Sequence, residues 1–224
     1  MKNKELFYTI IYIIFYVISN SIVLNNYGQI SIQSLLVNTV ITVTLISTII
    51  STKKTKYYGL IKVNKPKKYL YFIPLILLVL INFIGGIKIV NTPKEIVLFI
   101  LTMLEVGFIE EILFRGFLFK TIEKDDQKTA IVITSLTFGI GHIVNLLNGA
   151  NFIPTLVQII YSVSFGYLFV KILIKTKSLW PCIITHSLLN ALSIFSNQTT
   201  TIFYISSILM LMISISYSFY LNKK

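Results

Sequence analysis

Ionisable side chains interrupt the apolar stretches of this 224-residue chain at only a few positions. The chain contains two histidines and a single arginine, and each of them falls inside a stretch that is otherwise hydrophobic. Carboxylates, imidazoles and carboxamides can together accept a proton from water and hold a developing negative charge. The residues with this potential are Glu105, Glu110, Glu111, Arg115, His142, His186 and Asn190.

The spacing of two adjacent glutamates suggests that they have different tasks. Glu111 and Arg115 are four residues apart with the acid first, which is the favourable order for an ion pair on one helix face. Glu110 points about 100° away from Glu111 on a helix, which leaves it free to face a cavity as a general base. The structural alternative is that both glutamates share Arg115 as a partner.

Both histidines also have a companion four residues away. Phe138 and His142 share one helix face, so Phe138 can form a wall beside the imidazole. His186 and Asn190 share a face in the same way. The structural alternative for the two histidines is hydrogen bonding between helices.

The composition assigns the chain to the membrane. The hydrophobic share is 55%, the charged share is only 12% and the mean hydropathy is +0.81, well above the values of soluble domains. The net charge of +12 comes from lysines scattered between apolar stretches, which indicates membrane loops and no nucleic-acid partner. The single cysteine, Cys182, excludes an intramolecular disulfide and a cysteine zinc finger.

Eight apolar runs of about twenty residues predict eight transmembrane helices. The spans are helical because a backbone in lipid must satisfy its own hydrogen bonds, and the alternating segments of a barrel are missing from the sequence. The expected fold class is an all-α polytopic helical bundle that forms one membrane domain over residues 1–224. The expected spans are 6–24, 30–50, 70–90, 95–119, 129–147, 153–174, 179–196 and 201–221.

The lysines predict the orientation of these spans. Seventeen of them fall in the termini and in alternate connections, whereas Lys88 and Lys94 are the two on the other side. Positive charges accumulate in cytoplasmic loops, so both termini are expected in the cytoplasm of a multi-pass cell-membrane protein. The long basic loop 51–69 is expected along the inner leaflet.

The same lysines estimate the depth of the candidate residues. Glu110, His142, His186 and Asn190 lie about 14 to 21 Å from the nearest cytoplasmic lysine of their span, at about 1.5 Å per residue. This range is close to the middle of a hydrocarbon core about 30 Å thick. Three helices therefore offer a carboxylate, two imidazoles and a carboxamide at one level.

The candidate residues form three motifs along the chain: E-E-x-x-x-R at residues 110–115, F-x-x-x-H at 138–142 and H-x-x-x-N/D at 186–190. In this order they resemble the motifs of the CPBP family of intramembrane endopeptidases. This family comprises type II CAAX prenyl proteases and bacteriocin-processing or self-immunity proteins, and is also called the abortive-infection family. The resemblance covers roughly residues 93–195 and implies a catalytic core there.

The resemblance also implies roles for four residues. Glu110 and His142 would activate a water molecule, and His186 and Asn190 would hold the oxyanion. An older interpretation of the family makes Glu110, His142 and His186 zinc ligands, and two histidines with a glutamate are a known catalytic zinc set. We expect the metal-free version without a cofactor, and zinc is the alternative.

The predicted function is therefore an intramembrane endopeptidase that acts on a membrane-associated peptide or protein, such as a bacteriocin or pheromone precursor. A proton-coupled transporter is one alternative, because Glu and His at mid-membrane also form proton relays. A bacteriocin immunity protein that cleaves nothing is another. The excess of Lys, Ile and Asn over Arg and Ala indicates an AT-rich genome and a bacterial source.

Three residues near the motifs have less defined expectations. Glu105 lies in an apolar stretch and is a candidate for a protonated acid, a partner of an outer lysine or part of a cavity wall. Gly139 and Gly141 are small residues that would permit close approach of another helix.

Overall fold

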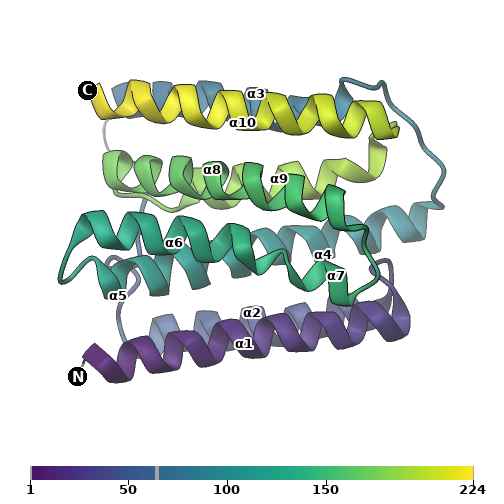
Figure 1. Cartoon of the computed structure of the whole chain (residues 1–224). Helices are drawn as coiled ribbons and strands as arrows, with labels where there is room; N and C mark the ends of the chain where they lie inside the picture. Colours follow the sequence, from purple (N-terminus) through teal and green to yellow (C-terminus); the bar gives the residue numbers. More distant parts are fainter. Residues whose placement is uncertain (1, 64–65, 224) are drawn as a thin grey trace.

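The computed structural model describes residues 2–63 and 66–223, which form a bundle of helices running back and forth (Figure 1). The eight expected spans are present as helical stretches, and the all-α class is confirmed. The elements are α1 Lys2–Tyr27, α2 Ile32–Ser51, η1 Pro66–Phe72, α3 Ile73–Leu80, η2 Ile81–Phe83, α4 Pro93–Glu111, η3 Ile112–Phe119, α5 Lys120–Ile122, α6 Gln127–Gly141, α7 Val144–Leu147, α8 Phe152–Thr176, α9 Trp180–Leu192, η4 Ser193–Phe195 and α10 Thr200–Lys223.

Five of these helices are long and apolar enough to cross a membrane, namely α1, α2, α6 with α7, α8 and α10. Two further apolar helices, Leu70–Phe83 and Trp180–Phe195, are shorter. The helix α4 ends with the two adjacent glutamates of the first motif, and its continuation η3 carries the arginine. This pattern is that of a multi-pass membrane protein.

The described chain ends lie at the same end of the bundle, on the left of Figure 1. This end, termed the lysine-rich end, also holds the connections α2–η1, α5–α6 and α8–α9. The opposite end, termed the lysine-poor end, holds the connections α1–α2, η2–α4, α7–α8 and η4–α10. Lys65 and Lys224, which the sequence assigns to the lysine-rich side, lie outside the described residues.

The prediction that the third span continues to residue 90 is wrong. Its helix ends at Phe83, because Gly86 adopts a positive φ of 86° that stops helical hydrogen bonding. The chain beyond it pairs with the segment after α9 instead: Lys88 N–H donates to Phe195 O at 2.9 Å and Asn197 N–H donates to Gly86 O at 3.1 Å.

Polar side chains fix where three of the helices begin. The Thr92 hydroxyl accepts from Glu95 N–H and the Glu95 carboxylate accepts from Thr92 N–H, which forms a capping box at α4. Ser31 caps α2 in a simpler way. Asp126 caps α6, and its hydrogen bonds from Thr129 hold the pKa of Asp126 below its ordinary value.

The helix with the first motif lies in the middle of the bundle. α4 packs against α2 and α9, and its continuation η3 packs against α1, α6 and α8. η3 is a π-helix of eight residues that follows Glu111 directly. Such wide turns occur often at functional sites, and this one places every side chain of η3 in the interior.

Glycines allow the motif-bearing helices to approach closely. A Cβ on Gly107 would lie 2.6 Å from Ser187 N, so α4 and α9 meet backbone to backbone. A Cβ on Gly139 would lie 2.8 Å from Val163 N, which confirms the expected close approach of α6 to α8. The same expectation for Gly141 is wrong, because a Cβ there would meet nothing within 4 Å.

Candidate active site

One buried carboxylate joins the first and third motifs. Oε1 of Glu111 lies 2.9 Å from Arg115 Nη1 and 2.9 Å from His186 Nδ1. The side chains of Glu111 and Arg115 have no exposed area, so the ion pair expected from their spacing is confirmed. A carboxylate paired with a guanidinium is a hydrogen-bond acceptor, so we assign His186 Nδ1–H as the donor of this contact. The other ring nitrogen, Nε2, is then turned away from Glu111.

Aromatic rings complete the surroundings of Arg115. Its guanidinium carbon lies 4.0 Å from the ring centre of Phe138 and 5.6 Å from that of Phe169, which favours a cation beneath the ring faces. Arg115 Nε and Nη2 and Glu111 Oε2 have no hydrogen-bond partner among the described residues. Each charge of this buried pair therefore depends on the other for its stability.

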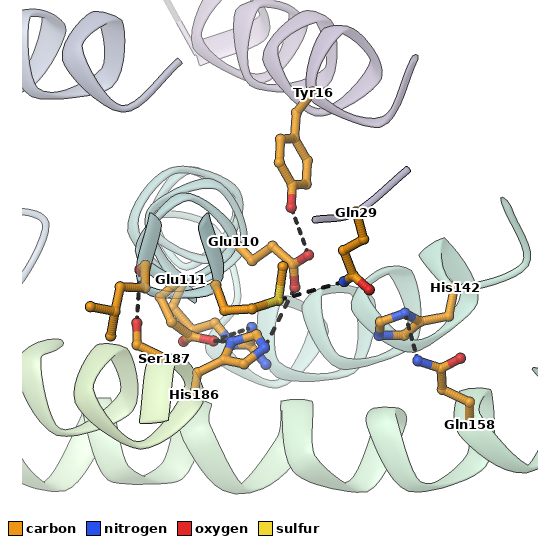
Figure 2. A network of polar contacts seen from close by, with 11 residues as sticks. Tyr16, Gln29, Glu110, Glu111, His142, Gln158, His186 and Ser187 are labelled. Atoms are coloured by element: carbon orange, nitrogen blue, oxygen red, sulfur yellow. Dashed lines mark hydrogen bonds and ion pairs between the residues drawn. The ribbon is translucent and has the colours of Figure 1, made fainter. Parts of the chain in front are cut away.

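Glu110 is held apart from this ion pair. Its Oε1 accepts a hydrogen bond of 2.8 Å from the Tyr16 hydroxyl of α1, and its Oε2 lies 3.7 Å from Nε2 of His186. Figure 2 shows the Glu110 carboxyl between the phenol and the imidazole. The two adjacent glutamates thus have different main partners, Tyr16 and Arg115, and lie near opposite nitrogens of the His186 ring, in agreement with the 100° between them on a helix.

His142 is the residue that ends α6, directly after Gly141. Gln158 Nε2 on α8 lies 3.4 Å from His142 Nδ1, and Gln158 Oε1 accepts from Asn145 Nδ2 at 2.9 Å. An amide NH2 only donates, so Nδ1 of His142 accepts and the ring proton resides on Nε2. The bond from Asn145 holds the Gln158 amide, which in turn contacts the His142 ring.

A cavity of about 520 Å³ connects the predicted residues. Glu110, His142, His186 and Asn190 all line it, which agrees with the single depth estimated from the sequence. Phe138 lines it too, with its ring centre 5.7 Å from that of His142 and 5.8 Å from that of His186. Phe138 thus lies beside both imidazoles and beside the buried guanidinium.

Asn190 presents a free amide to this cavity. Within residues 2–63 and 66–223, no hydrogen bond occupies its side chain, whereas its main-chain oxygen accepts from Ser193. It lies one helical turn from His186 on α9, so both side chains reach the cavity from the same helix.

Glu105 does not share the site. Its Oε1 accepts a hydrogen bond of 2.8 Å from the Thr39 hydroxyl of α2, and Glu105 is not among the lining residues of the cavity. Of the roles expected for Glu105, the cavity wall is therefore wrong. No lysine of the described segments forms an ion pair with Glu105.

The arrangement of the three candidate zinc ligands bears on the zinc alternative. In the part of the chain that the structure describes, no group of three or more His, Cys, Asp or Glu side chains is arranged to hold a metal ion. Nδ1 of His186 and Nδ1 of His142 face Glu111 and Gln158, so only the Nε2 atoms are left for a ligand. Zinc coordination by Glu110, His142 and His186 stays a prediction.

Two residues of the site were not among the sequence candidates. Tyr16 is one of thirteen tyrosines, and no spacing relates it to the motifs on other helices. Gln158 offered a weak signal, because it is a carboxamide in the middle of an apolar run. A polar residue inside a span is a candidate for a functional contact by that fact alone.

The fold and the site define a polytopic membrane protein with a carboxylate and two imidazoles around an internal cavity. Residues 92–192 match the family described as type II CAAX prenyl endopeptidase, Rce1-like. The match includes all three motifs and confirms the family resemblance seen in the sequence. The match over these residues supports an intramembrane endopeptidase at the level of the family. A comparison with curated proteins finds no match for the chain.

Proposed function

We propose that this protein is a glutamate-type intramembrane endopeptidase and that Glu110 is its general base. The observation that carries the proposal is that the two adjacent glutamates have different surroundings. Glu111 is buried in an ion pair with Arg115, whereas Glu110 lines the cavity with no lysine or arginine beside it in the described chain. A carboxylate placed in this way can take a proton from water.

Water activation requires both a base and a group that orients the water. With Oε1 of Glu110 bonded to Tyr16, Oε2 is the oxygen that accepts the proton of the water. The Nε2–H of His142 donates to a lone pair of the same water, because Nδ1 is occupied by Gln158. The oxygen of the water then attacks the carbonyl carbon of the substrate.

The tetrahedral intermediate carries a negative oxygen that needs donors. Asn190 supplies its unpaired amide N–H, and His186 supplies a second donor at Nε2, the ring nitrogen that its contact with Glu111 leaves free, when that nitrogen carries a proton. When the intermediate collapses, the C–N bond breaks and the proton held by Glu110 passes to the leaving amine. Glu110 is returned to its carboxylate form, and the two products are an acid and an amine.

The cellular setting proposed for this chemistry follows from the lysines and the composition. The protein is placed in the cell membrane of a bacterium, with both termini in the cytoplasm, as a single domain with its catalytic core in residues 93–195. Its partners are the lipid bilayer and a membrane-associated peptide or protein, of which bacteriocin and pheromone precursors are examples.

Comparative peptidomics tests this function. Cells would carry the native protein, Glu110→Gln or Glu105→Gln at equal membrane levels, the last as a matched control on the same helix outside the cavity. Peptides with one common cleavage position should appear with the native protein and with Glu105→Gln and be missing with Glu110→Gln. The same peptides in the presence of Glu110→Gln would contradict the proposal.

The same variants separate the alternatives. A non-catalytic immunity protein would still protect cells from a bacteriocin with Glu110→Gln, whereas a protease would not. A zinc enzyme would lose cleavage after chelation and regain it with added zinc, whereas the proposed mechanism keeps its rate after metal removal.

A further inference from the structure

The cavity that contains Glu110 extends toward one end of the bundle only. Its lining includes Gln29, Asn148 and Gln198, which lie in or beside the connections α1–α2, α7–α8 and η4–α10. All three connections are at the lysine-poor end (Figure 1). No lining residue in the described chain comes from the connections at the lysine-rich end. The catalytic groups are thus reached from the lysine-poor side.

The lining has an unusual composition for the interior of a membrane bundle. Nine of the lining residues are Asn or Gln and four are Ser. Glu110 is the one Asp, Glu, Lys or Arg among the described residues that line it. Polar groups at membrane depth are costly unless they face water or a ligand, so this surface is suited to a polar, uncharged occupant.

Carboxamides match a peptide backbone in particular. Each one carries a donor and an acceptor, as does each peptide unit of an extended chain. Some of the lining amides hold one another in place, since Asn38 Nδ2 donates to Asn20 Oδ1 at 3.0 Å. Others are available: the Asn190 side chain has no hydrogen bond in the described segments, and the Gln198 side chain is exposed at the rim.

A lipid chain would find a different place on this protein. An apolar groove of about 350 Å³ lies between α3 and α9 and has almost no polar surface. It shares no lining residue with the cavity of Glu110. An isoprenyl or acyl chain bound there would not lie among the groups that line the catalytic cavity.

We infer that the substrate enters from the lysine-poor end, which the lysine distribution assigns to the outer face of the membrane, as an extended and unlipidated peptide segment without charged side chains. The identification of the occupant as a substrate rests on the proposed function. The route itself depends only on the position of the cavity and on the charge distribution.

Cysteine labelling tests the route. In a Cys182→Ala background, Gln198→Cys marks the rim, Val106→Cys marks a deeper part of the cavity lining and Lys56→Cys marks an exposed site at the lysine-rich end. A membrane-impermeant maleimide should modify the first two in intact cells and Lys56→Cys only in inside-out vesicles. Modification of Val106→Cys only in inside-out vesicles would overturn the proposed route.

Protection from labelling tests the occupant. Purified Val106→Cys protein with Glu110→Gln, which cannot turn over a bound peptide, would be labelled with and without an excess of a neutral peptide of Gly, Ser and Ala. The peptide should slow labelling at least threefold, and a matched peptide with two Lys and two Asp should not. Protection by a farnesylated form alone, or by neither form, would overturn the substrate class.

The labelling and protection experiments can still be interpreted if the proposed function fails. Labelling and protection need no cleavage, so an inactive native protein would contradict the protease proposal and leave both readouts intact. Conversely, a cleaving protein that is labelled from the cytoplasmic side would retain its function and lose this inference.

Discussion

Nδ1 of His186 lies 2.9 Å from Oε1 of Glu111, although 75 positions separate the two residues in the chain. The same oxygen holds Arg115, and neither Glu111 nor Arg115 lines the catalytic cavity. The direction in which the His186 ring presents Nε2 is therefore set by a residue that does not meet the substrate. We therefore propose that the buried pair has a positioning role in addition to its part in the fold.

Glu110→Gln should remove activity without unfolding the protein. A glutamine keeps an oxygen that accepts from Tyr16, but it cannot take a proton from water, so kcat should fall by about 10²- to 10⁴-fold. The measurement is the cleavage rate of the purified protein on the peptide identified by peptidomics, together with its thermal unfolding. Glu105→Gln should retain the native rate, and a Glu110→Gln rate within threefold of native would contradict the assignment.

Replacement of Glu111 should affect stability and activity in separable ways. Glu111→Leu leaves the buried Arg115 without its partner, which should cost roughly 3–5 kcal/mol. Adding Arg115→Met removes the unpaired charge and should restore most of the stability, because apolar side chains of similar volume replace buried ion pairs well.

The double variant should nevertheless remain inactive. His186 has then lost the acceptor of its Nδ1–H, and replacement of such an orienting carboxylate lowers kcat by roughly 10⁴-fold in a comparable triad. Unfolding in denaturant and cleavage would be measured on the same samples. If the stable double variant cleaved at the native rate, Glu111 would have only a structural role.

Relationships within one helix were predictable from the sequence, because a helix fixes the angle between residues. The shared face of Phe138 and His142 and the separate direction of Glu110 follow from 100° per residue, and the Glu111–Arg115 pair forms as well although η3 is a π-helix. The common depth of the motifs followed from helical rise and lysine positions. Hydropathy alone could not locate the end of the third span, which the backbone of Gly86 determines.

Contacts between helices were not predictable in the same way. The bonds from Tyr16 to Glu110 and from His186 to Glu111 depend on how each helix is rotated about its axis. That rotation results from packing, such as the close approach of Gly107 to Ser187. A hydroxyl on a helix outside the motifs therefore gives no signal in the sequence.

Tyr16→Phe should reduce turnover with little effect on substrate binding. The variant keeps the buried ring and loses only the hydroxyl that orients Oε1 of Glu110. We expect kcat to fall about tenfold with an unchanged KM, because the hydroxyl acts on the base and small misplacements of reacting groups are costly. Tyr12→Phe is the matched control, since its hydroxyl contacts Thr48 outside the cavity. Equal rates for the two variants would refute a positioning role for Tyr16.

Gly107→Ala should push apart the two helices that carry the catalytic groups. The added Cβ would lie 2.6 Å from the backbone nitrogen of Ser187, which cannot move aside as a flexible side chain can, so overpacking should cost roughly 1–3 kcal/mol. Gly116→Ala is the control, because its Cβ would meet no atom closer than 3.9 Å. Since α4 bears Glu110 and α9 bears His186, Gly107→Ala should also lower kcat at temperatures where the protein remains folded. Native stability and activity in Gly107→Ala would mean that the backbone contact between α4 and α9 does not set the geometry of the site.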